Sequence, residues 1–181
     1  MLLTEARRTA RVSASGELVA LDDQDRGAWD RELIAEGHAL VRARLSSGQA
    51  PGRYQILAAI NAVHTDARDL RSTDWSQIVA LYDQLARLDP SPIVRLNRAI
   101  AVAELDGPEV ALAEIENLPL EGYHALHAAN AHLLRRLGRN EESRAAYERA
   151  IELAGNAAET AYLIRCRDQL AGSEPRPLPG K

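Results

Sequence analysis

Apolar residues recur along most of the chain at the three- and four-residue spacing that places them on one face of an α-helix. The pattern predicts about nine helices, beginning with a short one from Leu2 to Arg11, and only Leu18 to Leu21 is strand-like. Turn-forming residues separate the helices at Ser13–Gly16, Gly48–Gly52, Ala67–Thr73, Asp89–Pro92, Gly107–Pro108, Pro119, Gly138 and Gly155–Asn156. The sequence therefore predicts an all-α fold.

Polar residues at the expected helix starts are suited to accept hydrogen bonds from the free N–H groups of the first turn. These predicted caps are Asp25, Thr73, Ser91 followed by Pro92, Asn140, and Asn156 with Glu159. The apolar stripe of the second helix predicts the inward-facing side chains Trp29, Leu33, Ile34, Leu40, Val41 and Leu45. The third helix is expected to place Tyr54, Leu57, Ala58 and Asn61 along one face. The aromatic side chains of Trp29, Trp75, Tyr82 and Tyr147 are also expected to be largely buried.

Short connections from Trp75 onward indicate that successive helices are antiparallel neighbours. With Gly138 as its turn glycine, a tetratricopeptide-type unit covers His124 to Ala157, and Gly107 is the turn of a preceding unit that starts at Ile93. The pattern predicts a tetratricopeptide-like array of about eight or nine antiparallel helices. The expected organisation is a short helix and acidic linker over residues 1–24, a helical-repeat domain over 25–171, and a disordered Pro-rich tail over 172–181.

The composition of the chain excludes several kinds of binding site. A formal net charge of −4 supplies no positive field that would neutralise phosphates, so the chain is not expected to bind DNA or anionic membranes directly. Cys166 is the single cysteine, which excludes an internal disulfide and a paired-cysteine zinc site. A reducing cytoplasm fits this cysteine usage best, and no apolar run approaches the roughly 20 residues that span a bilayer.

Several sequence blocks follow one another in a distinctive order, with turn residues between them. They are Leu2–Arg8, Asp23–Arg26, Trp29–Asp30, Leu33–Gly37, Tyr54–Ile60, Thr73–Trp75, Leu81–Tyr82, Ser91–Pro92, Leu96–Val102, Gly122–His124 with His127, and Leu133–Gly138. Together these blocks resemble the helical C-terminal extension of a group of extracytoplasmic-function sigma factors. The resemblance implies a regulatory role in transcription initiation, with RNA polymerase or the sigma domains of the same parent chain as partner. The promoter-reading regions of that family would lie before Leu2, so no promoter contact is assigned here.

Two groups of residues are candidate partner contacts. The first is an acidic loop that would engage basic faces of the sigma domains, or would simply cap a helix while Trp29 anchors it; it comprises Asp22, Asp23, Asp25, Arg26 and Asp30. The second follows from the repeat register, which places Asn97, His132, Arg135 and Arg136 on the concave face. Asn97 either contacts a partner or ties adjacent helices by an internal hydrogen bond. Arg135 and Arg136 either hold an acidic segment or are solvated at the helix end.

Catalytic and metal-binding patterns are weak. His124 and His127 share a helical face, but His132 points away from them, so a metal-ligand set is incomplete. The sequence has no nucleophile elbow, phosphate loop or dinucleotide fingerprint. We therefore expect a non-enzymatic chain without a cofactor. The alternative to a sigma-factor module is a free-standing tetratricopeptide-type adaptor that binds a partner peptide.

Overall fold

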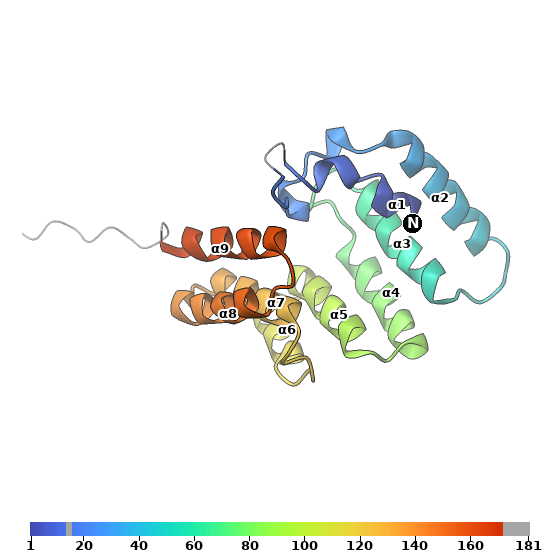
Figure 1. Ribbon diagram of the computed structural model, residues 1–181. Helices are drawn as coiled ribbons and strands as arrows, with labels where there is room; N and C mark the ends of the chain where they lie inside the picture. Colours follow the sequence, from blue (N-terminus) through green and yellow to red (C-terminus); the bar gives the residue numbers. More distant parts are fainter. Residues whose placement is uncertain (14–15, 172–181) are drawn as a thin grey trace, which may run out of the picture. The chain divides into compact units, whose positions relative to one another are not determined.

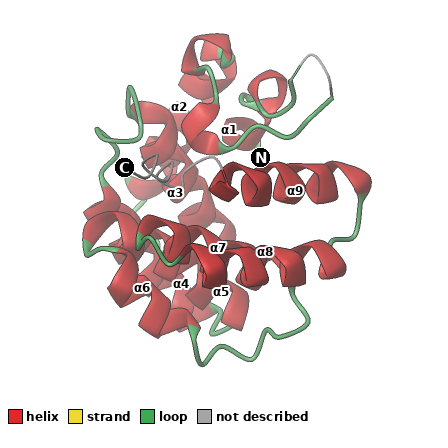
Figure 2. Cartoon of the chain, turned by 90° about the vertical axis from the view of Figure 1, so that its left-hand side faces the viewer, coloured by secondary structure: helices red, strands yellow, loops and turns green. Residues whose placement is uncertain are grey.

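The computed structural model describes residues 1–13 and 16–171, and these fold into nine α-helices (Figure 1). The helices are α1 (Leu2–Glu5), α2 (Arg31–Leu45), α3 (Arg53–Asp66), α4 (Trp75–Leu88), α5 (Pro92–Leu105), α6 (Pro108–Ile115), α7 (His124–Arg136), α8 (Asn140–Leu153) and α9 (Ala157–Ala171). Figure 2 shows no strand in the described part of the chain. Its β-type pairing is limited to an isolated bridge between Val12 and Leu18. The prediction of an all-α helical array is confirmed. Within the same residues, none of the helices combines the length and apolarity that a bilayer crossing requires.

The chain divides into two compact units, Met1–Pro119 with α1 to α6 and Leu120–Lys181 with α7 to α9. This division differs from the predicted boundary between residues 24 and 25. The reason is that α1 packs against both α2 and α3, so Leu3 and Ala6 are buried in the first unit. The predicted tail at 172–181 lies outside the described residues.

The core of the first unit is built by the helices that follow one another in the chain. One cluster of this core consists of the buried residues Ile56, Ile60, Ile78, Leu85, Val94 and Ala101, from α3, α4 and α5. Of the four aromatic residues expected inside, Trp29 and Tyr147 are buried, as predicted. Trp75 and Tyr82 are partly buried and pack against this core. The indole N–H of Trp75 donates to the carbonyl of Leu70 at 3.2 Å.

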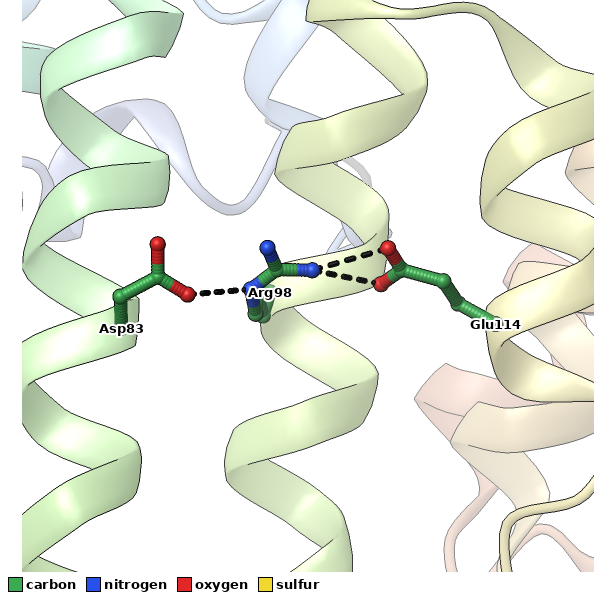
Figure 3. A network of polar contacts seen from close by, with 3 residues as sticks. All are labelled: Asp83, Arg98 and Glu114. Carbon is green, nitrogen blue, oxygen red and sulfur yellow. Dashed lines mark hydrogen bonds and ion pairs between the residues drawn. The ribbon is translucent and has the colours of Figure 1, made fainter.

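Arg98 joins three helices of the first unit (Figure 3). Its Nε donates to Asp83 of α4 at 2.7 Å, and its Nη1 donates to both carboxylate oxygens of Glu114 of α6 at 2.9 and 2.8 Å. These hydrogen bonds raise the pKa of Arg98 above its already high ordinary value. The Arg98 side chain is 28% exposed, so each ion pair adds little stability, but together they fix the register of α4, α5 and α6.

The second unit consists of α7, α8 and α9, with α8 in contact with both neighbours. Ser143 is fully buried and its hydroxyl donates to the carbonyl of Ala131 at 2.7 Å, which ties α8 to α7. Tyr147 lies in the same interior, and burial raises the pKa of its hydroxyl to about 12. Both predicted turn glycines are confirmed, since Gly107 and Gly138 have φ of 99° and 72°, a region that favours glycine.

Helix capping agrees with the sequence at two positions. Ser91 accepts from the N–H of Val94, and Asn156 accepts from the N–H of Glu159. Three predicted caps are wrong: Asp30 rather than Asp25 caps α2, Asp74 rather than Thr73 caps α4, and Asn140 is the first residue of α8. A 3₁₀ turn at Arg26–Ala28 separates Asp25 from α2, and the predicted first helix ends at Glu5 before a 3₁₀ turn at Arg8–Ala10.

Gly37 is the point at which α1 contacts α2, and a substitution at this residue tests how closely the two helices pack. A Cβ at Gly37 would lie 2.5 Å from Leu3 Cδ2 and 2.7 Å from Leu3 Cγ. Alanine normally stabilises a helix relative to glycine by roughly 0.5 to 1 kcal/mol. Here we expect Gly37→Ala to lower the free energy of unfolding by about 1 to 3 kcal/mol, the usual cost of overpacking.

Urea unfolding measures this change, and the same substitution made in a second variant of the chain identifies its cause. In a Leu3→Ala chain the obstructing side chain is gone, so Gly37→Ala should be neutral or stabilising there. An equal loss of stability in both backgrounds would show that the contact between α1 and α2 is not responsible.

Candidate functional site

Three members of the acidic loop have internal roles. Asp25 accepts from the N–H of Gly27 at 2.8 Å, and Asp30 accepts from the N–H groups of Glu32 and Leu33 at 3.0 Å. Arg26 donates from Nη1 to the carbonyls of His64 and Ala67 at 2.8 and 2.7 Å. Asp23 is exposed, and the Asp22 side chain lies outside the description. The loop is thus fastened to the end of α3, and Asp23 stands on its exposed side.

Trp29 fastens the same loop from inside. The guanidinium carbons of Arg26 and Arg7 lie 4.8 and 5.7 Å from the centre of its ring. His64 meets Trp75 edge to face at 5.4 Å, and burial, followed by the positive charges of Arg7 and Arg26, lowers the pKa of His64 to about 4. Among the described residues, the indole N–H of Trp29 and Nδ1 of His64 have no hydrogen-bond partner. This buried cluster therefore holds a neutral histidine beside two cations.

The predicted concave-face residues divide between the units. Asn97 lies in the first unit, on α5, where it is exposed and its side chain makes no hydrogen bond within the described residues. The internal hydrogen bond considered for Asn97 is therefore wrong, because its face of α5 also leaves Ile93 and Ile100 exposed. In the second unit, Arg135 donates to His132 Nδ1 at 3.3 Å, and Arg136 is exposed near the end of α7.

The two histidines considered as metal ligands contact the protein instead. His124 Nε2 lies 3.7 Å from a carboxylate oxygen of Glu159, and His127 Nε2 lies 2.8 Å from the carbonyl oxygen of Glu121. In residues 1–13 and 16–171, no three histidine, cysteine or acidic side chains converge as metal ligands would. These contacts give both imidazoles an architectural role within the second unit.

An apolar groove that the sequence did not predict lies among α1, α2 and α3, with a volume of about 320 Å³. Large apolar side chains stand exposed around it, with Leu40 58%, Leu45 62%, Tyr54 72% and Met1 53% exposed. Leu40 and Leu45 were expected to face inward, and this expectation is wrong. The reason is that α1 has only four residues and contacts α2 at Gly37, so it leaves the last two turns of α2 uncovered.

The neighbouring face of α2 forms a second, basic groove with the end of α3, with a volume of about 640 Å³. Four arginines and one aspartate line it, and Arg26 of the acidic loop is one of the arginines. The two helices are joined there by His38 Nε2 and Thr65 Oγ1, which are 2.9 Å apart. Residue periodicity could have identified its α2 face, since Arg31, Ala35, His38 and Arg42 share one side of the helix.

The fold and these surfaces define an all-helical module whose first three helices carry an apolar groove and a basic groove. Residues 1–45, which include α1 and α2, match a family described as a family of unknown function, DUF6596. A protein of Rhizobium meliloti (strain 1021), described as uncharacterized, is 47% identical over 177 residues, which are 97% of this chain and 41% of that protein. The chain thus spans less than half the length of this relative. No solved structure matches the chain.

Proposed function

We propose that this chain is a protein-interaction module that regulates an extracytoplasmic-function sigma factor, as part of its helical C-terminal extension. The observation that carries the proposal is the apolar groove among α1, α2 and α3, whose α1 and α2 walls lie in the segment that matches the family. The partner is inferred from the ordered sequence blocks that resemble these sigma factors, since the resemblance implies RNA polymerase or the sigma domains of the same parent chain. In this role the chain acts in the cytoplasm, has no catalytic function and needs no cofactor.

The occupant we assign to the apolar groove is a surface of the promoter-binding sigma domains. Clustered exposed apolar side chains on a folded protein mark interaction surfaces, since covering them removes apolar area from water at roughly 25 cal/mol per Å². The resemblance to sigma factors implies that a linker joins this module to the promoter-binding domains of the same parent chain. Such a linker raises the effective concentration of the domains it carries, which lets a modest apolar contact suffice.

Leu45→Glu tests this proposal, with Leu88→Glu as the matched control. Each leucine is the last residue of its helix and they are 62% and 55% exposed, but only Leu45 lines the groove. We expect Leu45→Glu to weaken binding to separately purified promoter-binding domains of the parent sigma factor by about tenfold or more. Leu88→Glu should leave binding unchanged, and neither variant should alter the free energy of unfolding by more than about 0.5 kcal/mol.

Calorimetric titration measures the association, and transcription by RNA polymerase with the full-length parent measures its consequence. Loss of both binding and sigma-dependent regulation in Leu45→Glu alone would support the proposal. Equal weakening by the two variants, or no binding by the unmodified chain, would contradict it. Transcription that does not respond to the module would favour the peptide-binding adaptor.

A further inference from the structure

The basic groove stands out because the whole chain carries a formal net charge of −4. Arg31 and Arg42 of α2 are exposed in its wall, and their guanidinium groups make no hydrogen bond or ion pair within the described residues. Arg68, just beyond α3, adds a third exposed cation, and Asp66 is the acidic residue of the lining. Exposed cations are thus gathered along one face of an acidic protein.

The groove is more than a charged surface, because its wall also contains apolar groups. Trp29 is buried against it, and Ile34 and Ala35 of α2 lie between the two arginines along the helix. A volume of about 640 Å³ is within the usual range of ligand-binding clefts. A ligand that fits this wall has both negative charge and apolar side chains.

From these features we infer that the groove binds an acidic, partly apolar peptide segment of a partner protein in extended conformation. The guanidinium fork suits carboxylates, which it can bind through two parallel hydrogen bonds. Arg31 and Arg42 are separated along α2 by about 16 Å at a rise of about 1.5 Å per residue. An extended peptide covers that distance in about five residues, so acidic residues near its two ends reach both arginines while apolar ones face Ile34.

Other occupants fit less well. Residues 172–181 contain one acidic residue, Glu174, against Arg176 and Lys181, so this segment lacks the negative charge the groove selects. A DNA duplex would carry its dense negative charge towards a protein that is itself net negative. The inference goes beyond the proposed function, because it concerns a different face of α2 and a partner that need not be a sigma factor.

The test is a selection of random peptides of about eight residues, displayed on phage, on the immobilised full chain. Arg31→Gln/Arg42→Gln removes the two charges and keeps good helix-forming residues. Arg87→Gln/Arg95→Gln is the control, with the same loss of charge at exposed positions of α4 and α5 outside the groove. Circular dichroism and thermal unfolding verify that both double variants are folded.

Enriched peptides should combine Asp or Glu with Leu, Ile or Phe, and synthetic copies should bind the groove variant at least about tenfold more weakly than the control. Enrichment without acidic residues, or an equal weakening in the two double variants, would overturn the inference. Competition of a labelled DNA duplex with the peptides for the unmodified groove would also overturn the inference. Failure of the Leu45→Glu experiment leaves this result unaffected, because Leu45 does not line the basic groove.

Discussion

Replacing Trp29 by alanine is expected to lower the free energy of unfolding by about 3 to 5 kcal/mol, the range for removing a buried aromatic side chain. Trp29 is 4% exposed and contacts the guanidinium groups of Arg7 and Arg26. It also holds the loop before α2 in place, where the N–H of Asp30 donates to the carbonyl of Ala6 at 2.9 Å. Its removal therefore leaves a cavity and loosens the contact of α1 with α2. Urea unfolding followed by circular dichroism measures the loss.

Two further substitutions separate the causes of this loss. Trp29→Phe keeps an aromatic ring and removes an indole N–H that has no acceptor among the described residues, so it should cost clearly less than alanine. Trp75→Ala should also cost less than Trp29→Ala, because Trp75 is only partly buried. A loss below about 1 kcal/mol for Trp29→Ala would contradict the anchoring role.

Acidification is expected to reduce stability through His64. Burial, Arg7 and Arg26 lower its pKa to about 4 in the folded chain, whereas an unfolded histidine titrates near 6.5. Between these values the unfolded chain binds the proton and the folded chain does not. The contribution of neutral His64 is therefore fully present above about pH 6.5 and is lost as the pH falls towards about 4. A difference of this size corresponds to a loss of about 3 kcal/mol.

The variant His64→Phe isolates this effect from the titration of carboxylates. It removes the titrating group and keeps a ring that can meet Trp75 edge to face. Unfolding free energies of both proteins, measured at several pH values, should diverge by about 3 kcal/mol across the window from about pH 6.5 to about pH 4. Parallel curves would show that His64 has an ordinary pKa and lies in a more solvated environment.

Local features of the fold were predictable from the sequence. The all-α class, the order of the helices, the turns at Gly107 and Gly138, and the caps Ser91 and Asn156 all depend on neighbours within a few residues. Helix periodicity and a left-handed turn glycine are of this kind, so one sequence is sufficient to recognise them. Where a 3₁₀ turn intervened after Asp25, the same local reasoning assigned the cap to the wrong residue.

The functional surfaces depended on the tertiary structure. The apolar stripe of α2 was evident, but its Leu40 and Leu45 are exposed because α1 is too short to cover them. Likewise, Arg26 appeared to belong to an acidic loop, yet it bonds to carbonyl groups at the end of α3, far away in the sequence. Whether an apolar face is covered, and which charges meet across a groove, depends on the helices that pack against it. Periodicity within one helix carries no information about those neighbours, so both grooves were decided by the packing of α1, α2 and α3.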